Sequence, residues 1–163
     1  MEEKFNIRQS ILEQEFAVCA GMMTQSDPWV TLGMTYEHCR KAFEGAFREV
    51  YILEIEKDLA GFVILQTQGT FKGYIQTIFM AEPHRGRGYG KKLLQFCEQS
   101  ILSYSPNLFI CVSSFNEGAI KLYEEFGFKK VGVLDNFLKM GYAELLFRKT
   151  YGSTLGYLGP SSE

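Results

Sequence analysis

Apolar and polar residues along the first half of the chain repeat with two periods, one helical and one strand-like. Ser10 and Thr35 are residue types that favour helix N-caps, and apolar positions follow each at helical spacing. We therefore predict helices over 10–23 and 35–47, separated by a break at 25–33. Alternation of apolar and polar positions predicts strands over 5–8, 50–56, 59–68 and 73–80. We also expect a bulge near Leu53 and turns at 57–58 and 68–70.

The pattern changes in the second half of the chain, where a helix is expected between two buried strands. Residues 88–103 carry apolar positions on one side, and 108–112 is a continuous apolar run, as in strands covered on both faces. With the strand that ends at Met80 they predict a β-α-β unit with parallel strands. Another helix begins at Asn116 and ends at Gly127, a residue that favours the C′ position. Two closing strands are predicted over 129–134 and 143–149.

The predicted element order is β-α-α-β-β-β-α-β-α-β-β. This order predicts an α/β (α+β) fold with one mixed sheet and helices on both of its faces. The length of the chain favours a single domain over 1–150. Residues 151–163 are rich in glycine and serine, so we expect them to form a loose C-terminal tail.

Composition limits the classes of partner. The net charge is −2, which argues against a wide nucleic-acid interface, so the basic residues that do cluster suit one small polyphosphate. The four cysteines form no C-x-x-C pair, and the two histidines complete no zinc pattern, so no metal site is expected. No apolar run approaches the roughly 18 residues of a membrane span, and no signal peptide is recognisable. We therefore expect a cytoplasmic protein with reduced thiols and no membrane partner.

One stretch, 82–92, has the composition of a phosphate-binding loop. It reads EPHRGRGYGKK and lies between a predicted strand and a predicted helix. Glycines let main-chain N–H groups converge, and the following helix N-terminus adds partial positive charge. The stretch is not a Walker A loop, because Lys92 follows Gly90-Lys91 where serine or threonine is required. It is not a dinucleotide fingerprint either, since counting from Gly86 or Gly88 finds no third glycine. A glycine-rich surface turn is the alternative without function.

The same stretch contains Arg85-x-x-Gly88-x-Gly90, which resembles the R-x-x-G-x-G/A motif of the GNAT acetyltransferase superfamily. Residues 116–128, NEGAIKLYEEFGF, resemble the second GNAT signature, N-x-x-A-x-x-h-Y-x-x-x-G-F, where h is apolar. The predicted element order is also that of the GNAT fold. The resemblance covers roughly residues 5–149 and implies an N-acetyltransferase that uses acetyl-CoA.

The resemblance implies a role for each matching position. Main-chain groups of Phe79 and Met80 would pair with the pantetheine arm, Asn116 would hydrogen-bond that arm, and Tyr123 would act as general acid at the thioester sulfur. An amine would attack directly, with a main-chain N–H near Met80 meeting the oxyanion. The pyrophosphate would be held by main-chain N–H groups of the segment Arg85, Gly86, Arg87, Gly88, Tyr89 and Gly90, with Lys91 nearby at the helix start. From its helical spacing alone, Tyr123 could instead be an ordinary core residue.

The sequence departs from the family pattern at the expected general base. Many members carry a glutamate on the strand before the glycine loop, but the matching residue here is Gln76. Glu54 and Glu144, on neighbouring predicted strands, are possible replacements, as is loss of the proton through water. The acceptor pocket is expected to form from residues 29–36, the loop at 135–142 and the middle strands. Its aromatic residues suit an apolar or cationic acceptor, with anchoring of the loops as the alternative: Trp29, Tyr36, Phe137 and Tyr142.

Other functions stay open on sequence alone. A non-catalytic acyl-CoA-binding regulatory module is the first alternative, favoured by Gln76. A second is an acyltransferase that uses another acyl group or an oxygen acceptor. The acceptor amine could belong to a small molecule or a peptide. Because family members often pair, a homodimer is a further possibility.

Overall fold

The computed structural model describes residues 3–160. Within this range seven strands form one sheet: β1 (Phe5–Ser10), β2 (Arg48–Ile55), β3 (Asp58–Gln66), β4 (Tyr74–Met80), β5 (Asn107–Ser113), β6 (Lys129–Asp135) and β7 (Ala143–Thr150). The helices are α1 (Glu13–Met23), α2 (Trp29–Leu32), α3 (Tyr36–Lys41), α4 (Tyr89–Leu102) and α5 (Glu117–Phe126), with a 3₁₀ turn, η1 (Glu82–His84), before α4.

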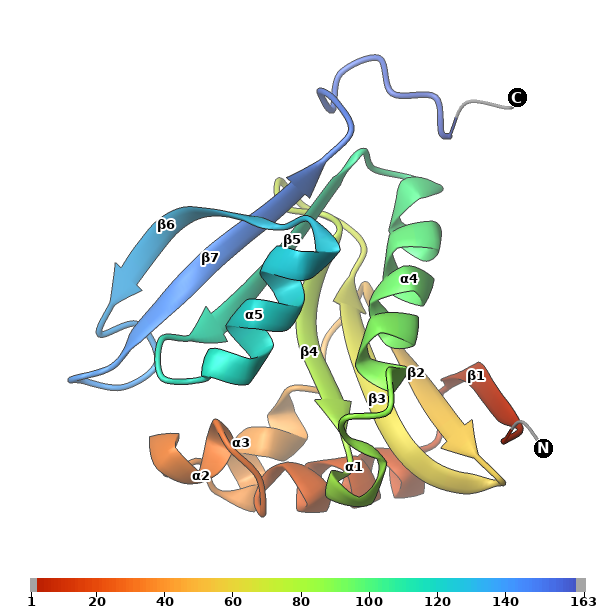
Figure 1. Ribbon diagram of the computed structural model, residues 1–163, viewed down its shortest axis with the longest axis vertical. Coiled ribbons are helices and arrows are strands. Elements are labelled where there is room, and N and C mark those ends of the chain that lie inside the picture. Colours follow the sequence, from red (N-terminus) through yellow and green to blue (C-terminus); the bar gives the residue numbers. More distant parts are fainter. Residues whose placement is uncertain (1–2, 161–163) are drawn as a thin grey trace.

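The sheet has the order β1-β2-β3-β4-β5-β7-β6 (Figure 1). Every neighbouring pair is antiparallel except β4 and β5, which are parallel and joined through α4. One buried cluster packs α4 and α5 against the sheet, and a second packs α1 and α3 against the opposite face. The mixed sheet, the helices on both faces and the β-α-β unit are therefore confirmed.

The strand predictions hold with small shifts. The bulge near Leu53 is confirmed as a register shift between Leu53 and Glu54 in the β2–β3 pair. The turn between these strands is centred on Glu56 and Lys57, with φ of 49° and 74°, one residue earlier than predicted. Asp58 already belongs to β3, because the two left-handed residues complete the reversal before it.

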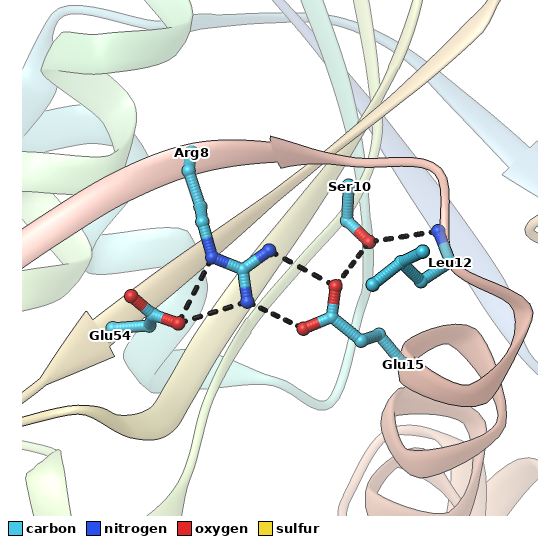
Figure 2. A network of polar contacts seen from close by, with 5 residues as sticks. All are labelled: Arg8, Ser10, Leu12, Glu15 and Glu54. Carbon is cyan, nitrogen blue, oxygen red and sulfur yellow. Dashed lines mark hydrogen bonds and ion pairs between the residues drawn. The ribbon is translucent and has the colours of Figure 1, made fainter.

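The start of α1 differs from the prediction, because Ser10 ends β1 and does not cap the helix. The Ser10 hydroxyl donates to Glu15 Oε1 at 2.6 Å and accepts from the Leu12 N–H at 3.3 Å (Figure 2). Arg8 joins the same cluster. It donates to both carboxylate oxygens of Glu15 and, through Nε at 3.0 Å, to Glu54 of β2. The Arg8 cluster thus ties β1, α1 and β2 together.

The predicted break at 25–33 does separate two helices, but it is not free of helix itself. It contains the short helix α2, which ends at Gly33 in the left-handed conformation, with φ of 67°. Glycine adopts this conformation without steric cost, so the chain reverses there. Thr35 then caps α3 as predicted, and its hydroxyl oxygen accepts from the His38 N–H at 3.2 Å.

The second helix is also shorter than predicted, because a residue of the next strand caps its C-terminus. The Arg48 guanidinium donates to the main-chain carbonyls of Lys41 and Ala42, each at 3.3 Å. These carbonyls lie in the last turn of α3, where helical partners are missing. The chain leaves the helix there and passes through Phe47, with φ of 66°, into β2.

The C-terminal half follows the prediction closely. Asn116 caps α5, with its Oδ1 accepting from the Ala119 N–H at 3.3 Å. Gly127 ends the helix at φ of 107°, and the Phe128 N–H bonds back to the Tyr123 carbonyl at 3.0 Å. These local signals are sufficient to fix both helix ends.

β4 and β5 pair over only two positions and then separate, which opens the sheet (Figure 1). The pairs are Tyr74 with Phe109 and Ile75 with Ile110. Just beyond, the β3–β4 register shifts so that Gln76 has no partner on β3. A bulge of this kind bends its strand, and here it stands where β4 leaves β5.

Residues 151–160 contain no helix or strand but contact the rest of the chain. The Tyr151 hydroxyl donates to Glu98 at 2.7 Å, and the Tyr157 hydroxyl donates to the Leu102 carbonyl, both on α4. The last three residues of the predicted tail lie outside the described residues. The division of the chain at residue 150 stays a prediction.

Two further observations concern residues 3–160. No helix in this range is both long and apolar enough to cross a membrane. The four cysteines are free thiols, and three of them are buried. Burial raises the pKa of Cys19 to about 12, so this thiol stays protonated at neutral pH.

Candidate active site

The opening between β4 and β5 leads to a cavity of about 620 Å³, which we call the outer cavity. Its walls are the end of β4, the glycine-rich stretch, the first turn of α4 and one side of α5. It is lined by Met80, Arg85, Gly86, Gly88, Gly90, Lys91, Asn116 and Tyr123, among others. Two segments that the sequence singled out, 85–91 and 116–123, therefore share one cavity.

The glycine stretch leaves its main chain open toward this cavity. Gly86 and Gly88 have φ of 72° and 85°, and a Cβ placed on either would meet nothing within 4 Å. Gly88 is also the N-cap of α4, so unpaired N–H groups of the helix begin there. Lys91 lies in the first turn and lines the cavity. Convergent amides, a helix N-terminus and one ammonium suit a diphosphate.

Two side chains of the glycine stretch point away from the outer cavity. Arg87 forms an ion pair with Glu3 at 2.5 Å, and the Tyr89 hydroxyl donates to the same carboxylate at 2.8 Å. Neither residue lines the outer cavity. The sequence predicted a cofactor-binding role for both residues through their main-chain N–H groups, and that role stays a prediction.

Arg85 also has a structural partner. Its Nε donates to the Met80 carbonyl at 2.8 Å, and its guanidinium lies 5.9 Å from the centre of the Phe79 ring. Arg85 still lines the outer cavity, so it both fixes the loop to the end of β4 and contributes positive charge there.

The free side of β4 presents alternate residues to the opening. The Ala81 N–H pairs with the Ala60 carbonyl of the β3 side at 2.7 Å. Main-chain groups alternate sides along a strand, so those of Phe79 point toward β3 and those of Met80 point toward the opening. Of the two residues predicted to pair with an extended ligand, the geometry favours Met80.

Asn116 and Tyr123 lie at the two ends of the inner side of α5. Asn116 Oδ1 is used by the helix cap, whereas its Nδ2 has no partner among the described residues. Tyr123 is 5% exposed, and its ring packs edge-on against Phe128 and Phe147. Burial raises the pKa of Tyr123 well above its usual range, so the hydroxyl is a proton donor at neutral pH.

A second cavity of about 260 Å³, which we call the inner cavity, adjoins the outer one. The two share the lining residues Pro28, Trp29, Ile78, Asn116 and Tyr123. Of the four aromatic residues expected in the acceptor pocket, Trp29 and Phe137 line the inner cavity, whereas Tyr36 and Tyr142 do not. Sequence reasoning missed Met23, Met34, Leu138 and Ser113, because no local pattern separates them from core or loop residues.

A family model described as "Acetyltransferase (GNAT) family" matches residues 11–128 of the chain. The chain belongs to the GNAT family. The solved structure of Arabidopsis thaliana NAA60 in complex with a bisubstrate analogue superimposes on it with a TM-score of 0.73. That comparison covers 92% of this chain and 100% of the other at 20% sequence identity, so it shows the GNAT fold alone.

Two curated relatives match parts of the sequence. An N-alpha-acetyltransferase of Sulfurisphaera tokodaii is 26% identical over 114 residues, which cover 62% of this chain and 66% of the relative. The uncharacterized N-acetyltransferase YycN of Bacillus subtilis is 31% identical over 83 residues, which cover 48% of this chain and 53% of the relative. The chain therefore matches less than two thirds of the length of either relative.

The position that carries a glutamate in many GNAT proteins is occupied here by a structural amide. Gln76 Nε2 donates to the Ala42 carbonyl at 2.8 Å, and its Oε1 accepts from Gln66 at 2.9 Å. Both ends of the Gln76 amide are thus used to hold the bulge of β4 and the end of α3. Gln76 lines the inner cavity but cannot take a proton from an amine.

The two carboxylates proposed in its place differ in surroundings. Glu54 lines neither cavity and is paired with Arg8 of the Arg8 cluster, which makes it a structural residue (Figure 2). Glu144 is 6% exposed and lines the inner cavity. Burial raises the pKa of the Glu144 carboxyl, while the neighbouring Ser113 hydroxyl opposes this rise. A raised pKa makes a carboxylate a better general base near neutral pH. Within residues 3–160, no group of three His, Cys, Asp or Glu side chains could hold a metal ion.

Proposed function

We propose that the chain transfers an acetyl group from acetyl-CoA to the nitrogen of a primary amine. The observation that supports this most directly is the meeting of the two cavities at Asn116 and Tyr123. One cavity leads to the glycine stretch and the other to a buried carboxylate, as a reaction between two separate substrates requires. Acetyl-CoA supplies an activated acetyl thioester at their junction.

The outer cavity would hold the cosubstrate through main-chain groups. Amides at Gly86 and Gly88, the N-terminus of α4 and the ammonium of Lys91 would bind the diphosphate. The free edge of β4 at Met80 and the Asn116 Nδ2 would bind the extended arm.

Tyr123 would serve the leaving group. The neutral amine attacks the acetyl carbonyl carbon, a C–N bond forms, and the C–S bond breaks with its electron pair on sulfur. The nitrogen loses one proton and the sulfur gains one, so the products are an amide and a thiol. The Tyr123 hydroxyl is protonated at neutral pH and would stabilise the leaving thiolate by hydrogen bonding. A main-chain N–H near Met80 would meet the oxyanion.

A non-catalytic acyl-CoA-binding module is the second candidate, because Gln76 has no basic function and both ends of its amide are engaged. An acyltransferase with another acyl group is chemically close to the main proposal, since nothing that binds the diphosphate reads the acyl chain. The name of the Sulfurisphaera relative makes a peptide N-terminus one candidate acceptor.

The test is a CoA-release assay with acetyl-CoA and a library of primary amines, followed by mass analysis of the products. We expect a mass increase of one acetyl group on at least one amine, with release of one equivalent of CoA. Tight binding of acetyl-CoA without transfer to any amine would contradict the proposed acetyltransferase activity and support a non-catalytic acyl-CoA-binding module. If acetyl-CoA is replaced by longer acyl-CoA esters and only these give product, the result would support an acyltransferase that uses another acyl group.

A further inference from the structure

We propose that Glu144, at the floor of the inner cavity, binds the ammonium group of the acceptor, and that this acceptor is a monocationic primary amine on an apolar body. The inference rests on the proposed function and names the class of its second substrate. It follows from a buried carboxylate without a counter-ion and from the character of the surrounding walls.

Glu144 is a buried charge with an unused oxygen. It is the second residue of β7 and pairs with Ser113 of β5, and its Oε2 has no hydrogen-bond partner among the described residues. Buried carboxylates are normally paired with a cation or fully hydrogen-bonded, because desolvation of an unpaired charge costs several kcal/mol. The Ser113 hydroxyl is near enough to lower the pKa of Glu144, but it makes no hydrogen bond within the described structure. A buried carboxyl group with an unpaired oxygen is a site that a hydrogen-bond donor from outside would complete.

The missing cation does not come from the cavity wall. Among the described residues that line the inner cavity, Glu144 is the single charged side chain. The groups that face it from β4 and β5 are the phenol of Tyr74, the thiol of Cys111 and the Ser113 hydroxyl, none of which is cationic. A positive ligand would therefore find one anionic contact in the inner cavity, which Tyr123 also lines.

The remaining walls are mainly apolar and select what carries the ammonium. Met23, Leu32 and Met34 line the side next to the helices, while Phe137 and Leu138 line the side next to the β6–β7 loop. A second ammonium or a carboxylate on the acceptor would have to be desolvated against these side chains without a partner. The wall chemistry therefore disfavours polyamines and free amino acids.

A carboxylate next to the amine would be disfavoured for a second reason. In a free α-amino acid it would lie within a few ångströms of Glu144, and like charges in a buried site repel strongly. The same compound with its carboxylate converted to an amide would lose this repulsion. A series of four amines therefore tests the site. We expect phenethylamine and phenylalanine amide to be better acceptors than phenylalanine and spermidine.

The bound amine must also lose a proton before it attacks. Glu144 Oε2 can accept one proton from the ammonium, which leaves a neutral amine with a free electron pair and a neutral carboxyl group. The carboxyl then returns the proton to water. No other reactant is needed, and the step uses the same oxygen that binds the ammonium.

The experiment measures kcat/KM for the full chain with acetyl-CoA and this series, together with a short peptide amide that begins with phenylalanine. We expect phenethylamine and phenylalanine amide to exceed phenylalanine and spermidine by at least tenfold. The peptide distinguishes the two sources of such an amine: equal or better use of the peptide indicates an N-terminus, and its exclusion indicates a small amine. Preference for spermidine or phenylalanine would overturn the proposal while leaving acetyl transfer intact.

Glu144→Gln provides the direct test, with Glu49→Gln as the control, because Glu49 is a partly buried sheet carboxylate that lines neither cavity. We expect Glu144→Gln to raise KM for phenethylamine about tenfold and to leave the KM for acetyl-CoA unchanged. Calorimetric binding of phenethylamine, measured with CoA present, separates the two proposals if no amine is acetylated. Saturable binding that is lost in Glu144→Gln would support the site, and equal binding to both proteins would overturn it.

Discussion

Asn116 and Tyr123 lie seven residues apart on α5, and each lines both the outer and the inner cavity. Two helical turns place them about 10 Å apart along the axis, on the same side of the helix. Asn116 also begins the helix, so its position and that of Tyr123 are fixed by the same cap. A ligand that enters beside the glycine stretch and passes Asn116 reaches Tyr123 where the acceptor cavity opens.

Tyr123→Phe is expected to lower kcat about 100-fold, since a positioned acid typically contributes 10²–10⁴. The affinity for CoA should hardly change, because the hydroxyl serves the leaving sulfur and not the bound cofactor. Burial raises the pKa of Tyr123, so the acid should stay protonated and the rate should show no loss from it up to about pH 10. Steady-state kinetics and CoA titration measure both effects.

Tyr104→Phe is the matched control for this variant. Tyr104 is a partly buried tyrosine whose buried hydroxyl has no partner in the described structure, and burial raises its pKa in the same way. It lines neither cavity. Equal kcat in the two variants would dismiss Tyr123 as the acid.

Local signals were sufficient to predict much of the fold. The cap of α5 at Asn116 and its end at Gly127 depend on neighbouring residues, and both predictions were confirmed. The failures arose where the side chain of a neighbouring element decided the outcome. Ser10 was taken from the α1 cap by Glu15 and the Arg8 cluster, and α3 ended early because Arg48 of the next strand caps its carbonyls.

The candidate site was predictable in part for the same reason. The glycine stretch and the 116–123 segment are contiguous motifs, and both line the outer cavity. The direction of the Arg87 and Tyr89 side chains depends on Glu3, which is more than 80 residues away from both. No sequence pattern reveals this contact. The distinction between Glu54 and Glu144 likewise needed the sheet register, which buries one beside the cavity and pairs the other with Arg8.

Gly88→Ala is expected to weaken CoA binding about tenfold. A Cβ at φ of 85° strains the main chain by about 1 kcal/mol and disturbs the amides at the start of α4. Gly69→Ala is the control, because Gly69 has φ of 95°, has equally open surroundings and lines neither the outer nor the inner cavity. Both variants should lose similar stability, and only Gly88→Ala should bind CoA more weakly. Parallel losses of CoA affinity in the two would contradict the assigned cradle.

Arg8→Leu is expected to destabilise the fold by about 2 kcal/mol at neutral pH, because it leaves Glu15 and Glu54 adjacent without their cation. Arg8 lowers the pKa of Glu15, so this stabilisation is present above the ordinary glutamate pKa and is lost as the pH falls through the lowered value. The difference between wild type and variant should therefore shrink in acid. Urea unfolding at several pH values measures it.

The control for the Arg8 cluster is Lys121→Ala, which removes an exposed pair between Lys121 and Glu125 at 3.9 Å. Such a pair contributes about 0.5 kcal/mol or less. A loss in Arg8→Leu no larger than this would show that the cluster has no special role in joining β1, α1 and β2.

Gln76→Glu is expected to destabilise the protein by about 1–3 kcal/mol and not to raise turnover. The substitution removes the N–H donor to the Ala42 carbonyl and places two acceptors against each other. Gln95→Glu, at an exposed position of α4, adds the same charge without this conflict and should be nearly neutral. A stable, faster Gln76→Glu enzyme would show that the structural amide is not required and that a base at this position is usable.

Glu144→Gln is expected to stabilise the fold at alkaline pH while it impairs the acceptor site. Burial raises the pKa of Glu144, so the folded state holds this proton more tightly than the unfolded state. The corresponding stabilisation is present below the ordinary glutamate pKa and is lost as the pH rises through the raised value. Glutamine stays neutral throughout. The variant should therefore gain stability relative to wild type as the pH rises from 4 to 8.

Urea unfolding of both proteins between pH 4 and pH 8 would measure this gain, with Glu49→Gln expected to follow wild type. The result shows whether the Glu144 carboxylate is already compensated within the fold. A wild type that loses stability relative to Glu144→Gln on going to pH 8 has an uncompensated buried charge, which a cationic substrate would neutralise. A wild type that keeps its relative stability at pH 8 has a carboxylate already satisfied within the fold, and such a group would have no reason to attract an ammonium.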